Sequence, residues 1–104
     1  MTPERQKYFA KMSKEELDSL TFKDFLVDEI EEFKNNTPLS PEEKNNVDLF
    51  FIQGMKASAV AKIIHVSRAT AYRMRKELSL RMKKTLQMML YKEGKDEKKK
   101  IILP

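Results

Sequence analysis

The chain of 104 residues has no cysteine and no tryptophan, and it has only two glycines, four prolines and one histidine. Without cysteine there can be no disulfide, no thiolate zinc site and no iron–sulfur cluster, and His65 alone cannot form a metal cage. We therefore expect no metal and no cofactor. Few glycines and prolines beside 36% charged and 40% hydrophobic residues are typical of a small all-α domain.

The sequence also lacks long apolar segments and catalytic constellations. No apolar run approaches the ~20 residues that cross a bilayer, and the first five residues, MTPER, lack the apolar core of a signal peptide. We expect a cytoplasmic protein with no membrane contact. No Ser/His/Asp set, carboxylate pair or glycine-rich phosphate loop is evident, so we do not expect an enzyme.

Charge of the two signs is divided between the two halves of the chain. Residues 1–53 hold 7 Lys/Arg and 12 Asp/Glu, whereas residues 54–104 hold 14 Lys/Arg and 4 Asp/Glu. Between Met55 and Lys92 there are ten basic residues and one acid, Glu77. This density favours a polyanionic partner such as nucleic acid for the second half, and it leaves the acidic half for another role.

Helix-capping signals divide the first half. Ser13-Lys14-Glu15-Glu16 is a capping-box sequence, which predicts a short helix to about residue 20. Thr21 with Asp24 offers a second cap, and apolar residues from 22 to 33 recur at helical spacing, which predicts one helix there. The sequence NNTP at 35–38 ends that helix, because a residue before proline avoids the α region. We expect residues 1–38 to form an acidic helical segment.

The clearest start signal is Ser40-Pro41-Glu42-Glu43, with a cap, a proline at the first helical position and acids in the first turn. It leads into Val47, Phe50 and Phe51, with Leu49 and Ile52 on another side, so we expect this helix to be covered on two faces. Gly54 suits the residue after its end.

Residues 57–78 carry the pattern of a helix-turn-helix. The first helix is expected from about residue 57 to 64, with Val60, Ala61 and Ile64 turned inward and Ala61 at the closest approach of the two helices. His65 and Val66 form the turn. Ser67 caps a second helix over about 67–78, with buried Ala71, Met74 and Leu78.

The stretch VAKIIHVSRATAYR, residues 60–73, resembles the helix-turn-helix of the resolvase and invertase DNA-binding domains. Residues 39–86 are also similar to the fourth region of bacterial sigma factors and to small phage or plasmid regulators built on it. The resemblance implies DNA binding. It departs at His65, where the family usually has glycine at a position that often needs positive φ. A resolvase also needs a catalytic serine in a large preceding domain, and this acidic segment does not resemble one.

The face of the second helix that remains after its apolar side is buried is expected to enter the major groove. Its base-reading residues are Arg68, Ala69, Tyr72 and Arg73, because arginine pairs bidentately with guanine and a small side chain fits a thymine methyl. Candidate phosphate contacts are Lys56, Lys62, Ser67, Thr70, Arg75, Lys76, Arg81 and Lys83. The plainer alternatives are that Tyr72 only packs and that the arginines form a solvated surface.

A further amphipathic stretch follows from about residue 79 to 91, and the sequence allows it either to continue the second helix or to be separated from it by a break near Ser79. Its apolar stripe consists of Leu78, Met82, Leu86, Met89 and Leu90. The stripe either packs on the aromatic segment at 22–33 or pairs with a second subunit, and we predict the pairing, because two recognition helices on one DNA face raise specificity. Residues 39–92 are thus expected to form the DNA-binding domain, and residues 93–104 a flexible basic tail.

Three functions compete. The leading hypothesis is a sequence-specific double-stranded DNA-binding regulator of transcription from a bacterium, phage or plasmid, acting as a homodimer, with RNA polymerase or another protein as a candidate partner of the acidic half. The alternative is a packaging, partition or replication accessory, similar to a small terminase, that marks a DNA site. A third is a helical interaction protein that binds no nucleic acid.

Overall fold

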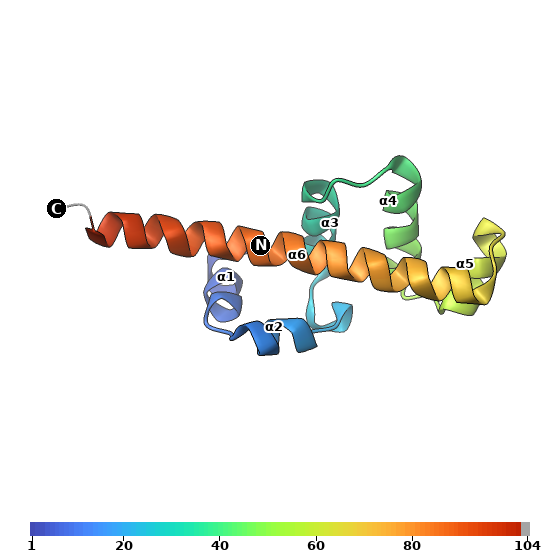
Figure 1. The fold of residues 1–104 in the computed structure, drawn as a ribbon, viewed down its shortest axis with the longest axis horizontal. Helices are drawn as coiled ribbons and strands as arrows, with labels where there is room; N and C mark the ends of the chain where they lie inside the picture. Colours follow the sequence, from blue (N-terminus) through green and yellow to red (C-terminus); the bar gives the residue numbers. More distant parts are fainter. Residues whose placement is uncertain (103–104) are drawn as a thin grey trace.

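The protein is built around one long helix, and the shorter helices are arranged beside it (Figure 1). The computed structural model describes the backbone of residues 1–102 and the side chains of residues 1–90. Its helices are α1 (Pro3–Ala10), α2 (Lys14–Ser19), α3 (Val27–Asn36), α4 (Pro41–Val47), α5 (Ala57–Ile64) and α6 (Arg68–Ile102), with a 3-10 turn at Phe22–Asp24 and a π-helical turn at Asp48–Ile52. Residues 1–102 contain no strand, which confirms the all-α expectation.

Two of the predicted start signals form complete capping boxes. Ser13 Oγ accepts from the backbone N–H of Glu16 at 3.2 Å, and Ser40 Oγ accepts from that of Glu43 at 3.1 Å. Each glutamate returns a carboxylate oxygen to the cap's own N–H, at 3.4 Å and 2.9 Å. These local bonds satisfy N–H groups that a helix start leaves without partners, so α2 and α4 begin where the sequence predicts.

The single helix expected over 22–33 is wrong, because the chain extends at Phe25 and Leu26. The Thr21 cap forms, with its N–H donating to the Asp24 carboxylate at 2.8 Å, but it supports only one 3-10 turn. α3 then starts afresh, where the Glu29 carboxylate accepts from the Leu26 N–H at 2.9 Å. The break allows Phe25 to point into the core, 7% exposed, whereas Leu26 stays 55% exposed. The predicted end at 35–38 is confirmed, since α3 stops at Asn36.

Sequence reasoning missed helix α1, although its signal was present. Thr2 caps it, Pro3 occupies the first turn, and an acid follows. α1 is fastened to α3 through Arg5, whose Nε and Nη2 donate to the buried Glu29 carboxylate at 2.6 Å and 2.9 Å. Burial alone would raise the pKa of Glu29, but hydrogen bonds from Arg5 and from the Leu26 backbone hold that pKa below its ordinary value.

The turn after the π-helical turn Asp48–Ile52 follows the prediction for Gly54. Gly54 adopts φ +67°, and the Met55 N–H then bonds to the Leu49 carbonyl at 3.0 Å, six residues back. Leu49 and Phe50 are buried, while Phe51 and Ile52 are half-buried against the same core. The expected covering on two faces is therefore confirmed.

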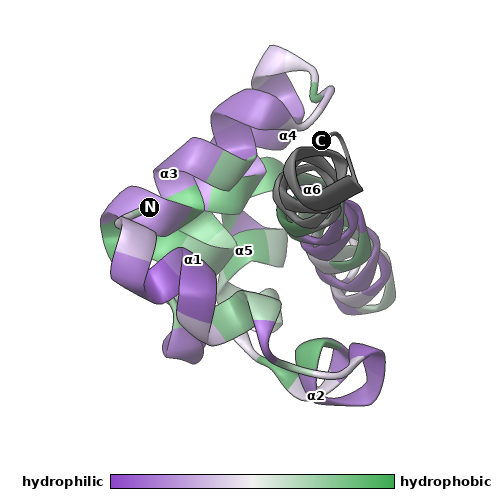
Figure 2. Cartoon of the chain, turned by 90° about the vertical axis from the view of Figure 1, so that its left-hand side faces the viewer, coloured by the Kyte–Doolittle hydropathy of each residue, from purple (hydrophilic) through white to green (hydrophobic). Residues whose placement is uncertain are grey.

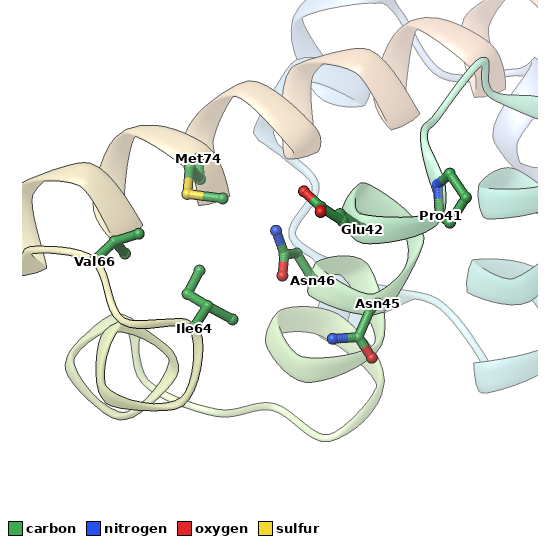
Figure 3. Close-up of a pocket in the computed structure, with 7 residues that line it drawn as sticks. All are labelled: Pro41, Glu42, Asn45, Asn46, Ile64, Val66 and Met74. Atoms are coloured by element: carbon green, nitrogen blue, oxygen red, sulfur yellow. The ribbon is translucent and has the colours of Figure 1, made fainter.

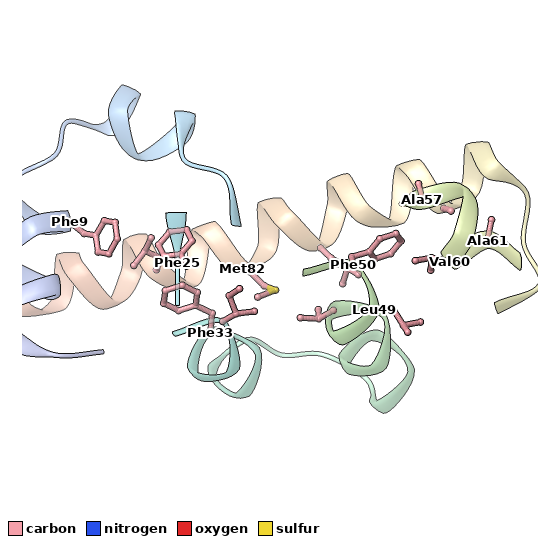
Figure 4. Packing of buried hydrophobic residues seen from close by; sticks show 14 of the residues in the cluster. Phe9, Phe25, Phe33, Leu49, Phe50, Ala57, Val60, Ala61 and Met82 are labelled. Atoms are coloured by element: carbon pink, nitrogen blue, oxygen red, sulfur yellow. The ribbon is translucent and has the colours of Figure 1, made fainter. Parts of the chain in front are cut away.

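The predicted oligomerisation stripe lies in the chain's own core. Leu78, Met82 and Leu86 are at most 3% exposed, Leu90 is 9% exposed, and Met89 packs partly buried against them. α1 and α3 cover this part of α6, and Figure 4 shows Met82 beside the aromatic cluster from the N-terminal half. Figure 2 colours the ribbon of α5, near the middle of the molecule, mostly as hydrophobic and that of α4 mostly as hydrophilic.

These five residues were assigned to the wrong role, because the aromatic N-terminal segment already covers them. The core includes residues on both sides of the boundary expected at residue 38, such as Phe9, Phe33 and Val60. The homodimer thus loses the observation on which its prediction rested. α6 continues without a break at Ser79 and reaches Ile102, into the segment 93–104 predicted to be a flexible tail, whose side chains lie outside the described residues.

Candidate nucleic-acid interface

The turn between α5 and α6 has the backbone geometry that the sequence pattern predicts. α5 ends at Ile64, and His65 adopts the left-handed conformation with φ 59° and ψ 49°. The N–H groups of His65 and Val66 both bond to the Ala61 carbonyl, the second at 3.0 Å. A histidine therefore occupies the position that usually takes glycine, at some cost in backbone strain.

Ser67 begins the second helix as predicted. Its Oγ accepts from the Thr70 N–H at 3.1 Å, and its hydroxyl donates to Thr70 Oγ1 at 2.8 Å. Thr70 Oγ1 also accepts from Arg73 Nη2 at 3.4 Å. The Ser67 hydroxyl proton is thus used within the turn, whereas Thr70 Oγ1 only accepts in these bonds, so the Thr70 hydroxyl and the backbone N–H donors of the first turn are the groups left for an anion.

Small residues allow α5 and α6 to pack closely. Ala61 and Ala71 are 4% and 0% exposed, and Val60 is fully buried beside them. Among the described residues, α5 and α6 share more contacts than any other two elements do. The expected position of Ala61 is therefore confirmed, and the axis of the second helix is fixed relative to the first.

Three residues expected to be buried are only half-buried. Ile64, Val66 and Met74 line a cleft of about 520 Å³ whose other wall is α4, with Asn45 and the buried Asn46 (Figure 3). α5 and the start of α6 meet α4 less tightly than the sequence suggests, because the α4 wall of the cleft carries polar rather than apolar side chains.

The predicted base-reading residues share one exposed surface at the start of α6. Arg68, Ala69, Tyr72 and Arg73 are all exposed, and Tyr72 is 58% exposed, so it does not pack into the core. We call these four residues the reading face. They project from the first two turns of a helix whose opposite side is buried at Ala71 and Leu78.

The predicted phosphate contacts separate into two groups. Lys56, Lys62, Arg75 and Lys76 are exposed on or beside the two helices, as a phosphate contact requires. Arg81 is committed elsewhere, because its guanidinium donates to the Glu43 carboxylate and to the Pro38 carbonyl.

Arg81 lies on the side of α6 that faces the start of α4, so its assignment to DNA phosphate is corrected to a tie within the fold. Lys83 is intermediate, with its Nζ donating to the Asp18 carbonyl at 2.9 Å. The Ser40 backbone N–H, and then Arg81, hold the pKa of Glu43 below its ordinary value.

A cleft beside the reading face is not predicted by any pattern in the sequence. Lys23 and Phe22 line this cleft together with Tyr72, Arg75 and Ser79 of α6. No pattern in the sequence links residues 22 and 23 to residues 72–79, because only the folded chain brings the segment after α2 against this helix.

Comparison of the chain with protein-family models, with curated proteins and with solved structures finds no match. Among the described residues, no helix has both the length and the apolar character needed to span a bilayer. Within the same part of the chain, no three His, Asp or Glu side chains gather as a metal site would require.

Proposed function

We propose that this protein binds double-stranded DNA sequence-specifically and regulates transcription, with the start of α6 in the major groove. The observation that carries the proposal is the reading face: four exposed residues at the N-terminus of a helix held by a left-handed turn and a serine cap. If the arginines of the reading face formed only a solvated surface, neither the tight turn at His65 nor the buried alanine contact that fixes this helix would be needed.

The chemistry of the reading face suits base edges. Arg68 and Arg73 carry guanidinium groups that can bond to O6 and N7 of guanine, and Ala69 is small enough to meet a thymine methyl. Exposed Lys56, Lys62, Arg75 and Lys76 would neutralise phosphates on either side of the groove. Base contacts and phosphate contacts would thus come from adjacent surfaces of one rigid unit.

The first experiment is fluorescence anisotropy with the duplex upstream of the protein's own gene and with a scrambled duplex, at several salt concentrations. We expect a preference for the native duplex that persists at physiological salt. Arg68→Ala should weaken that duplex by about 10- to 100-fold and the scrambled duplex far less, since a bidentate base contact contributes ~1–3 kcal/mol of discrimination. Lys84→Ala, an exposed cation away from the reading face, is the matched control.

Other outcomes separate the competing functions. Equal loss on both duplexes from Arg68→Ala would refute its base-reading role. Equal binding of both duplexes with a steep salt slope would favour the packaging or partition accessory. If neither duplex bound at low salt, the interaction protein without nucleic acid would replace this proposal, with the acidic N-terminal half as its docking surface.

The homodimer is a separate question, because the stripe on α6 is buried. A monomer presents one recognition helix, whereas two copies would read half-sites roughly 34 Å apart. Sedimentation of the protein alone and on the preferred duplex distinguishes the two. A dimer would have to use a surface other than Leu78, Met82 and Leu86.

A further inference from the structure

A cleft of about 630 Å³ lies between the segment after α2, the π-helical turn and the middle of α6. Its apolar part includes Phe22 and Phe51, whose ring centroids are 4.2 Å apart with the rings tilted by 30°. Both rings are only half-buried and line the cleft, so part of their surface remains accessible from it. The volume falls within the range of small-molecule sites, ~300–1,000 Å³.

The rim of the same cleft is cationic. Lys23, Arg75, Lys76 and Lys83 line it, and the lining includes no carboxylate. Among the described residues, none of these four cations forms an ion pair. An aromatic floor under a rim of one charge sign is complementary to a ligand with an apolar body and an anionic head.

The walls of the cleft are tied together. Lys83 Nζ donates to the Asp18 carbonyl at 2.9 Å, and Gln87 Nε2 donates to Asp18 Oδ1 at 3.0 Å. These two bonds join the end of α2, and the segment that follows it, to α6. The cleft is therefore formed by the fold itself and does not depend on a ligand to bring its walls together.

We propose that this cleft binds a small amphipathic organic anion, an aromatic or aliphatic carboxylate, sulfonate or phosphate. Its apolar body lies on Phe22 and Phe51, and its head lies among the rim cations. The sugar–phosphate backbone of DNA offers no flat apolar group to cover the two rings, and a base could reach them only after being flipped out of the duplex.

The cleft also touches the DNA-binding surface, because Tyr72 belongs to the reading face and Arg75 and Lys76 are phosphate candidates. This step rests on the proposed DNA-binding function. If the duplex binds at this surface, the anion and the duplex compete for the same cations. The ligand would then act as an inducer that releases the protein from DNA. Bound ligand would lower the affinity for DNA by the same factor by which bound DNA lowers the affinity for the ligand.

The test is a titration with 1-anilinonaphthalene-8-sulfonate, an aromatic anion that fluoresces when it leaves water. We expect saturable binding of one probe per chain, weakened about tenfold or more in Lys23→Gln/Arg75→Gln because two charge-assisted contacts are lost. The control, Lys7→Gln/Lys84→Gln, removes the same net charge from exposed positions outside the cleft and should retain probe affinity within about twofold. Circular dichroism confirms that both variants fold.

No saturable binding at millimolar probe, or equal weakening in the two double variants, would overturn the site. A second titration measures duplex affinity with and without saturating probe, where we expect the probe to weaken DNA binding. Unchanged affinity would overturn the competition. If the protein bound no DNA, the first titration would still decide the cleft, so failure of the two proposals is distinguishable.

Discussion

The burial of Met82 gives the sharpest test of the fold. Met82 is 0% exposed at the middle of α6, where the N-terminal helices cover it, whereas Met88 on the same helix is 65% exposed. Met82→Ala removes three buried heavy atoms, at a cost of about 2 kcal/mol in lost transfer free energy. The cavity left after partial relaxation adds about 1 kcal/mol. The expected loss of unfolding free energy is thus about 3 kcal/mol.

Urea denaturation followed by circular dichroism measures this loss, and Met88→Ala is the matched control, expected to change stability by less than about 0.5 kcal/mol. The same experiment tests whether the stripe belongs to the monomer. If Met82 packs against its own chain, Met82→Ala lowers the midpoint without changing how the midpoint depends on protein concentration, whereas at a dimer interface the substitution would also change that dependence. A loss below about 1 kcal/mol for Met82→Ala, or a changed concentration dependence, would refute the reasoning.

Three further substitutions test other parts of the structure. Glu29→Gln should lower the free energy of unfolding by about 2 kcal/mol, because Arg5 loses its charged partner. The pKa of Glu29 is lowered in the folded state, so the stabilisation by this ion pair is complete above the ordinary glutamate pKa of ~4.3 and is lost as pH falls through the lowered folded value. Acid titration of the variant should not show that loss of stability. His65→Gly should stabilise by about 0.5 kcal/mol, seen as a higher Tm, because glycine relieves the strain at φ 59° and offsets its own entropy cost; a lower Tm would contradict this. Arg81→Gln should lower stability by about 1 kcal/mol and leave DNA affinity unchanged, whereas a loss of affinity as large as that of Arg73→Ala would restore its phosphate role.

Local signals in the sequence determined where several of the helices begin. Ser13, Ser40 and Ser67 are followed three residues later by groups they bond, so their caps need no tertiary contact. The turn at His65 is equally local, because two N–H groups close onto one carbonyl four and five residues back. The same holds for the reading face, whose exposure follows from helical spacing once the buried side is known. Its role on DNA stays a prediction.

Tertiary structure decided which surfaces are covered and by what. The apolar stripe that includes Met82 shows only that this face of α6 must be covered. The sequence does not distinguish an aromatic cluster of the same chain, which is what covers it, from a second subunit. Arg81 and Arg73 are alike as residues, but only Arg81 lies opposite Glu43. The cleft at Phe22 and Phe51 arises from segments almost thirty residues apart. Periodicity specifies which face of a helix is apolar, whereas the partner depends on long-range packing that no local pattern encodes.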